Sequence, residues 1–465
     1  MQFSSFLDSR RKNCKELVNI LSKSFSYVSI LGSETHALAY RADKNISSVS
    51  ENEGECGFVI KMHDKNAFYE YSLNDISGDL NDLAAKITEK VKVDPSLVKQ
   101  TVGIKDFSDE PLVKDFVRQS DFDDYSDEEL LSVCKEVSKD VLSASDKVLN
   151  AIVAISPYTV SKLFITANRE LSQHYSWANA FVIALYFDGK MSQARKSFGS
   201  DKLKDIIDGM RNCKDYVVDL AAHLAKASPI TPGVYDVITD SSITGLIAHE
   251  AFGHGVEMDM FVKDRALAKN YIGKYVASPI TNMHDGAAAT HSAASFFFDD
   301  DGVLAHDTQI IKDGILVAGL SDLASANQLG TAPTGNGRRE SYKRKAYSRM
   351  TNTFFEKGND KLEDMIKSVK HGYMLFETNN GMEDPKTWQI QCTAEYGIEI
   401  VDGKLTDNYV SPVVMSGYVP DLLKSISMIS DNFEVFGTGY CGKGYKEWVR
   451  VSDGGPNLKV RVKLG

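Results

Sequence analysis

The stretch ITGLIAHEAFGHGVEMD, residues 243–259, constrains this chain more than any other part of its sequence. It follows Asp240-Ser-Ser, whose side-chain oxygens can cap the start of a helix. It then runs through apolar residues into His249 and Glu250, and His254 follows. Two histidines flanking a glutamate on one helix are typical of hydrolytic zinc sites. Neutral imidazoles bind the metal there, and the carboxylate takes a proton from the attacking water.

The spacing of the two histidines is unusual. Helical zinc proteases commonly carry HExxH, with ligands at positions i and i+4, whereas this chain has HExxxH, with His249 and His254 at i and i+5. On a regular helix an i+5 neighbour is rotated by roughly 140°, so the two rings would point apart. One π-type turn would realign them, and Gly253 is a suitable place for it. Alternatively the helix is regular and the two histidines are unrelated.

A catalytic zinc site needs a third protein ligand. Glu257, on the same helix face as His254, could bind the metal or could brace a ligand imidazole. The other candidates are His284, His291, His306 and Cys441. Cys441 ranks narrowly first, because glycines surround it and a thiolate binds zinc strongly. It could equally be a small buried residue in a tight turn.

Composition limits the classes of protein that fit. A chain of 465 residues exceeds one compact core, which predicts two domains or more. The net charge of −11 argues against a general nucleic-acid or anionic-membrane surface, so we expect neither partner. We find no signal-peptide pattern and no apolar span of membrane length. The six cysteines are scattered, which predicts reduced thiols and a cytoplasmic location.

The residue patterns predict an α+β fold. We expect an N-terminal α+β domain over residues 1–228 and a C-terminal, mostly antiparallel β domain over 229–465 that carries the HExxxH helix. In the first domain, helices are predicted at 3–24, 76–99, 126–149 and 201–226, with an antiparallel meander at 26–73. The acidic residues 106–129 are predicted to form an exposed loop. In the second domain, predicted strands include 294–298 and 302–305.

The segment 334–340, TGNGRRE, superficially looks like a phosphate-binding loop. It lacks the Gly-Lys-Ser/Thr ending of such loops, and an isolated GxG is a weak signal. Arg338 and Arg339 could instead contact a substrate carboxylate or a developing oxyanion. An ordinary surface loop is the competing interpretation.

Four sequence blocks together resemble the TldD/PmbA family of zinc peptidases, also called modulators of DNA gyrase. The blocks are HEAFGHGVEMD, PTGNGRR at 333–339, RMTNT at 349–353 and YCGKG at 440–444. Their order and spacing match the family from about residue 228 onward, and the first 50 residues match only loosely. Tyr440 departs from the pattern, because a smaller residue is common there.

The resemblance implies specific roles for these residues. His249, His254 and Cys441 would bind Zn²⁺, and Glu250 would act as general base. The position of Glu257 on the helix, rather than the resemblance, is what predicts that it braces a ligand. Arg338, Tyr342 or Asn352 would stabilise the oxyanion.

The same resemblance implies a zinc-dependent peptidase that cleaves peptides or unfolded polypeptides. It would act as a homodimer, or as a heterodimer with a paralogue that lacks the motif. The alternatives are a non-enzymatic protein-binding regulator of the gyrase-modulator type and a zinc amidase for small molecules.

Overall fold

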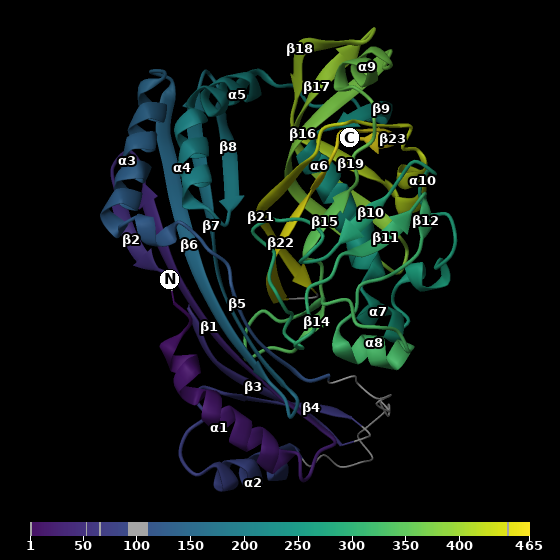
Figure 1. Cartoon of the computed structure of the whole chain (residues 1–465). Helices are drawn as coiled ribbons and strands as arrows, with labels where there is room; N and C mark the ends of the chain where they lie inside the picture. Colours follow the sequence, from purple (N-terminus) through teal and green to yellow (C-terminus); the bar gives the residue numbers. More distant parts are fainter. Residues whose placement is uncertain (1, 53, 65–66, 92–109, 444–445) are drawn as a thin grey trace.

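The computed structural model describes residues 2–52, 54–64, 67–91, 110–443 and 446–465 (Figure 1). The first part of the chain is organised around a long, curved sheet that eight strands form within the described residues. Its strand order is β4-β3-β1-β6-β7-β5, with β2 beside β1 and β8 beside β7. Their bounds are β1 Tyr27–Ala42, β2 Ser47–Glu51, β3 Glu55–His63, β4 Phe68–Leu73, β5 Leu112–Val117, β6 Val148–Ile165, β7 Arg169–Phe187 and β8 Met191–Ser200.

Two groups of helices cover this sheet toward opposite ends of its long strands (Figure 1). Helices α1 (Ser5–Leu21) and α2 (Leu80–Val91) pack against β1 and β3. Helices α3 (Asp127–Ser143), α4 (Leu203–Asn212) and α5 (Lys214–Lys226) pack against β6, β7 and β8. The start of α3 has a capping box between Ser126 and Glu129, as the sequence predicts.

The rest of the chain carries three further sheets within the described residues. Their strand orders are β12-β11-β10-β15-β22-β21, β13-β14 and β16-β9-β23-β19-β17-β18, with β20 beside β23. The strands are β9 Gly233–Thr239, β10 Met283–Asp285, β11 Thr308–Lys312, β12 Ile315–Leu316, β13 Gly337–Arg338, β14 Tyr347–Ser348, β15 Asn352–Phe355, β16 His371–Asp384, β17 Gln389–Val401, β18 Lys404–Val410, β19 Val413–Tyr418, β20 Met428–Ile429, β21 Glu434–Lys443, β22 Lys446–Gly455 and β23 Leu458–Leu464.

Strand β16 also pairs with β17, so β16, β9, β23, β19 and β17 form a closed ring. One buried core contains Val237 and Val460 of this ring together with Ile247 and Phe252 of the motif helix. The ring of strands therefore packs against the motif helix and supports it. The short helices of this part are α6 Ser241–Leu246, α7 Met258–Val262, α8 Leu323–Leu329, α9 Leu362–Lys367 and α10 Val419–Lys424.

The predicted α+β fold class is confirmed. Most strand pairs are antiparallel, and the parallel exceptions are β5–β7, β15–β22 and β9–β16. The domain boundary between residues 228 and 229 stays a proposal. It is supported because every strand of the first sheet precedes it and every strand of the other sheets follows it. Within the described part of the chain, none of the helices combines the length and apolar character that crossing a bilayer requires.

Three local predictions need correction. Within the predicted acidic loop, residues 112–117 form strand β5, because Phe116 stacks on Phe297 with ring centroids 5.1 Å apart. Residues 106–109 of that loop and 92–99 of the predicted helix 76–99 lie outside the described residues. The predicted helix 201–226 is two helices that meet at Cys213. The predicted strands 294–298 and 302–305 share only a single bridge between Phe298 and Leu304.

Buried ion pairs join the first sheet to the C-terminal part. Lys61 of β3 pairs with Asp301, and their side chains are 9% and 1% exposed. Burial alone would lower the pKa of Lys61, but the Asp301 and Glu70 carboxylates hold it above its usual value. Lys162 of β6 pairs with Asp300 in the same loop. Separating a buried ion pair leaves an uncompensated charge and costs roughly 3–5 kcal/mol of stability. These contacts therefore fix the loop against the sheet.

We expect Lys61→Met to destabilise the protein by about 3–5 kcal/mol, because the Asp301 carboxylate would stay buried without its cation. Urea unfolding followed by tryptophan fluorescence measures the loss. The double variant Lys61→Met/Asp301→Asn should regain part of the stability, and Lys12→Met on the exposed face of α1 should change little. A single variant as stable as wild type would refute the importance of this pair.

Candidate metal centre

The motif helix begins directly after strand β9. The Asp240 side chain accepts a hydrogen bond of 2.7 Å from the Ile243 N–H and so caps helix α6. Helix α6 continues without interruption into a π-helix, η3 (Ile247–Gly253), and then into a 3₁₀ turn, η4 (His254–Val256). The N–H of His254 donates to the carbonyl of His249. The widened turn that the histidine spacing predicts is therefore present.

Glycines allow the close packing around this turn. A Cβ at Gly253 would lie 2.0 Å from the Met350 sulfur. A Cβ at Gly381 of β16 would lie 2.4 Å from Cγ of Glu250. The helix is thus held against its neighbours on both sides of the histidine pair, with no space for larger residues at these two positions.

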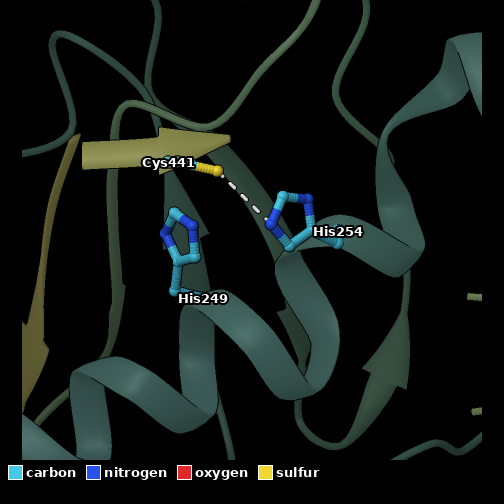
Figure 2. A group of neighbouring side chains, drawn as sticks. All are labelled: His249, His254 and Cys441. Atoms are coloured by element: carbon cyan, nitrogen blue, oxygen red, sulfur yellow. Dashed lines mark hydrogen bonds between the residues drawn. The ribbon is translucent and has the colours of Figure 1, made fainter. Parts of the chain in front are cut away.

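The widened turn brings both histidine rings to the same side, where Cys441 of strand β21 meets them (Figure 2). The ring centroids of His249 and His254 are 5.2 Å apart. Sγ of Cys441 lies 3.3 Å from Nε2 of His254. One donor atom from each of the three residues lies within 4.8 Å of the other two. The structure brings together the three residues that the sequence analysis assigns as zinc ligands.

The donor set fits a zinc ion. Two imidazoles and a thiolate are ligands that zinc prefers, and tetrahedral coordination separates nitrogen and sulfur ligands by roughly 3.5 Å. His249 and Cys441 are 3% and 4% exposed. Nδ1 of His249 is buried and has no hydrogen-bond partner in the described part of the chain. A buried nitrogen without a partner is costly in a purely structural histidine.

The three side chains also shift one another's protonation. Burial alone would raise the pKa of the Cys441 thiol, but His254 and His249 lower it well below its usual value. Burial alone would lower the pKa of His249, and the Cys441 thiolate raises it to about 9. Cys441 therefore tends toward the thiolate, which is the form that binds metals.

Glu257 braces His254 from the opposite side of the ring. Its Oε2 lies 3.2 Å from Nδ1 of His254, which leaves Nε2 facing Cys441. Burial alone would raise the pKa of Glu257, but Lys443, His254 and Arg349 lower it below its usual value. This arrangement is the one in which a carboxylate fixes the tautomer and orientation of a ligand imidazole.

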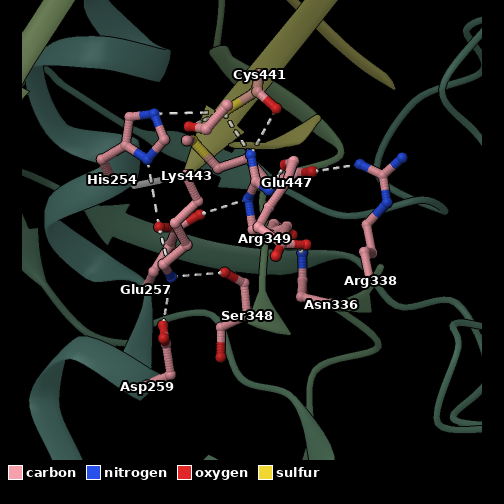
Figure 3. Close-up of polar contacts among 12 residues, drawn as sticks. His254, Glu257, Asp259, Asn336, Arg338, Ser348, Arg349, Cys441, Lys443 and Glu447 are labelled. Atoms are coloured by element: carbon pink, nitrogen blue, oxygen red, sulfur yellow. Dashed lines mark hydrogen bonds and ion pairs between the residues drawn. The ribbon is translucent and has the colours of Figure 1, made fainter. Parts of the chain in front are cut away.

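Two cations that the sequence analysis did not single out complete this network (Figure 3). Nζ of Lys443 lies 2.9 Å from Oε2 of Glu257. The Arg349 guanidinium is fully buried, and its Nη2 donates to the carbonyl oxygen of Cys441 at 2.7 Å and to its sulfur at 3.0 Å. Arg349 belongs to the RMTNT block and Lys443 to the YCGKG block, and this membership was the only sequence signal for either residue.

Glu250 lies beside the second histidine of the motif. Its Oε2 is 3.8 Å from Nε2 of His254. Glu250 lines a cleft of about 760 Å³, which is also lined by His254 and Cys441. It lines a second hollow of about 310 Å³ as well. Glu383 lines the larger cleft with both carboxylate oxygens buried and unpartnered in the described residues. Burial raises the pKa of Glu383 well above its usual value.

The three candidate oxyanion residues lie in different surroundings. The Tyr342 hydroxyl donates to Asn74 at 2.6 Å, and the Asn352 amide donates to the carbonyls of Gly286 and Thr290 at 3.1 Å each. Neither residue borders the cleft around Cys441. Arg338 lines a third hollow that shares Tyr440 and Trp448 with this cleft.

The remaining histidines do not join the three donors. His284 contacts Asp307 and Glu356, and His291 contacts Asp201, at distances of 2.7 to 3.0 Å. His306 lies on the exposed surface. Among the described residues, the alternative third ligands are therefore engaged elsewhere or open to solvent, apart from Glu257.

Known proteins resemble this chain in sequence. A family model described as the PmbA/TldA metallopeptidase C-terminal domain matches residues 232–463. A protein named as a metalloprotease from Synechocystis is 31% identical over 337 residues, which are 71% of each chain. A metalloprotease TldD homolog from Haemophilus influenzae is 32% identical over 57% of this chain and 55% of its own. A zinc metalloprotease TldD homolog from Saccharolobus solfataricus is 31% identical over 52% of this chain and 53% of its own.

Solved structures match the fold along almost the whole chain. A protein named as a modulator of a DNA gyrase from Thermotoga maritima has a TM-score of 0.79 at 17% identity, over 98% of this chain and 99% of its own. TldE from Thermococcus kodakarensis has a TM-score of 0.74 at 17% identity, over 97% of this chain and 100% of its own. The sequence alignments are shorter, and in most of them the chain spans about half the length of its curated relative. With one relative aligned over 71% of both chains at 31% identity and a family model that matches residues 232–463, this chain belongs to the TldD/PmbA metallopeptidase family.

Proposed function

We propose that this protein is a zinc-dependent peptidase that cleaves peptides or unfolded polypeptides. The observation that carries the proposal is the meeting of His249, His254 and Cys441 beside Glu250, at the wall of an open cleft. The metalloprotease names of its relatives add support. A protein that only bound partners would gain nothing from a basic carboxylate placed beside a metal-binding group.

His249, His254 and Cys441 would hold the zinc ion. When bound, zinc supplies Lewis-acid activation of a carbonyl and of a water molecule. Glu250 takes the proton of the attacking water and then delivers it to the leaving amine. Glu257 keeps the His254 ring oriented, and Arg349 and Lys443 keep Glu257 ionised. Arg349 also holds the backbone at Cys441.

The cleft suits an extended chain. Residues 380–383 of β16 line the larger cleft, and residues 378–381 line the second hollow. This strand therefore runs past Glu250 along both spaces. A peptide laid along it would be bound mainly through its backbone, which gives loose sequence preference. A folded protein could not present such a segment, and this favours unfolded substrates.

We further propose that the chain works in the cytoplasm as a homodimer, or as a heterodimer with a paralogue that lacks the motif. The structural likeness to TldE is consistent with a related partner chain. The free cysteines, Cys441 included, suit a reducing compartment. The size of the particle in solution, alone and with candidate paralogues, tests the assembly.

We expect Glu250→Gln to retain zinc and to lose peptide hydrolysis by about 10²–10⁴-fold, because the amide cannot take up a proton. Hydrolysis of a peptide mixture followed by mass spectrometry, with metal analysis of the same sample, gives both readings. Glu363→Gln, on the exposed side of α9, is the matched control and should hydrolyse at the wild-type rate. Wild-type hydrolysis by Glu250→Gln would refute the assignment of the base.

Replacing Cys441 should remove the metal. We expect Cys441→Ala to bind less than a tenth of the zinc that wild type binds, because two imidazoles alone bind zinc weakly. Metal analysis after dialysis measures this. Cys56→Ala, at an exposed cysteine, should keep the full zinc content. Full zinc occupancy in Cys441→Ala would contradict the donor set.

We expect Glu257→Gln to weaken zinc binding by about 10–100-fold, the usual effect of losing the carboxylate behind a ligand imidazole. Competition with a coloured chelator measures the dissociation constant, and circular dichroism confirms that the variant is folded. Asp264→Asn, at an exposed carboxylate near the same helix, serves as control. Unchanged affinity in a folded Glu257→Gln protein would count against the bracing role.

A further inference from the structure

A third hollow, of about 310 Å³, lies between the first sheet and the hairpin that carries Cys441. Its lining includes Tyr158 and Trp177 from the long strands β6 and β7. Tyr440 of β21 and Trp448 of β22 line both this hollow and the cleft that Cys441 lines. A peptide bound in the cleft could therefore place a neighbouring residue in this hollow.

Arg450 is buried in the wall of the hollow and has no acidic partner among the residues that the structure describes. It is 7% exposed, and its guanidinium carbon lies 3.5 Å from the centroid of the Trp177 ring. It donates to Asn179 at 2.7 Å and to the carbonyl of Gly437. Its Nε is buried and has no hydrogen-bond partner within the described residues. Burial lowers the pKa of Arg450 to about 10.

Arg338 adds a second uncompensated cation to the same wall. Its Nη1 donates to the carbonyl of Met350 at 2.6 Å, and its guanidinium lies 5.5 Å from the Phe296 ring centroid. No ion pair joins Arg338 to a carboxylate in the described part of the chain, which leaves its Nε and Nη2 nitrogens without an acidic partner there. Arg338 is half-buried, so these nitrogens remain accessible from the hollow.

Among the described residues, none of the acidic groups of the hollow forms an ion pair with either arginine, and each has another partner. Asp300 pairs with Lys162, Asp299 accepts from the Gly337 N–H, Glu55 accepts from the Tyr342 N–H, and Glu340 lies near Arg344. Burial also raises the pKa of Glu55 to about 7 and that of Asp299 well above its usual value. A buried and a half-buried guanidinium that lack an acidic partner among the described residues are costly, which indicates a site built for an anion.

We propose that this hollow binds a carboxylate of the peptide substrate, while the scissile bond lies beside Cys441 in the adjoining cleft. The carboxylate is the terminal α-carboxylate or the side chain of an aspartate or glutamate. Guanidinium groups bind carboxylates through paired N–H donors, and the aromatic walls pack against the carbon chain of the same residue. This inference rests on the proposed peptidase function and adds a preference to it.

Binding to the inactive Glu250→Gln protein tests the proposal without hydrolysis. Fluorescent peptides of one sequence are compared in pairs: free acid against amide at the end, and glutamate against glutamine at each internal position. We expect one carboxylate form to bind about 10–100-fold more tightly than its neutral counterpart, the usual effect of a charge-assisted hydrogen bond. The pair that shows the difference identifies which carboxylate is bound.

Arginine variants in the same background show whether the hollow is responsible. Arg338→Gln should reduce the preference at least tenfold, whereas Arg338→Lys, which keeps the charge, should retain part of it. Arg450→Gln should act in the same direction, with thermal melting as the check of its fold. Arg211→Gln is the control: this exposed cation of α4 pairs with Glu136 at 2.9 Å and lines none of the three hollows. It should leave the preference unchanged.

The outcomes separate this proposal from the peptidase assignment. Equal affinity within every pair, no measurable binding of any peptide, or a preference that survives Arg338→Gln undiminished would each overturn the carboxylate site. A preference that depends on Arg338 in a protein whose wild type hydrolyses nothing would uphold the site and refute the peptidase function.

Discussion

One hydrogen bond sets the geometry of the whole centre: the N–H of His254 donates to the carbonyl of His249, five residues earlier. In a regular α-helix that N–H would reach the residue four positions back, and the two rings would diverge. The wider turn places both rings on one side, facing the strand that carries Cys441. A π-turn is less favourable than a regular one, and here buried packing against Met350 and β16 holds it in place.

The charges around the centre form one connected network. Glu257 is shared by His254, Lys443 and Arg349, and Arg349 also holds the carbonyl and sulfur of Cys441. The network therefore links the motif helix to strand β21 through groups that are almost fully buried. Buried charges with several partners keep their positions because any displacement would leave one of them unpaired. The donors are thus held in place by the protein itself, which is the arrangement that a binding site needs in order to act without rearrangement.

The sequence predicted the parts of the structure that depend on local pattern. The helix cap at Asp240 and the capping box at Ser126 follow from side chains a few residues away, and the widened turn follows from the spacing of His249 and His254. Chemistry alone ranked Cys441 first among the possible third ligands. The predictions became weaker where a residue's role depends on distant partners. Strand β5 forms because Phe116 meets Phe297, which is far away in the sequence.

The same limit applies to the candidate site. Arg349 sits in a recognisable block, but only the fold shows that its guanidinium reaches Cys441. Tyr342 and Asn352 were selected from their blocks, and the fold gives both of them bonds to groups outside the cleft. The sequence pointed to Arg338 as a possible contact for a substrate carboxylate, but the hollow around it also combines residues of β6, β7 and β22, which only the fold brings together.

The closed ring of strands has a consequence for biosynthesis. Strand β9 leads into the motif helix, and its partner β23 spans residues 458–464, more than 200 positions later. Until the ribosome has released that stretch, β9 lacks one of its two neighbours and the helix above it lacks a complete support. The motif helix therefore gains its complete support only when residues 458–464 have paired with β9, so the order in which these distant segments meet decides when the three donors are brought together.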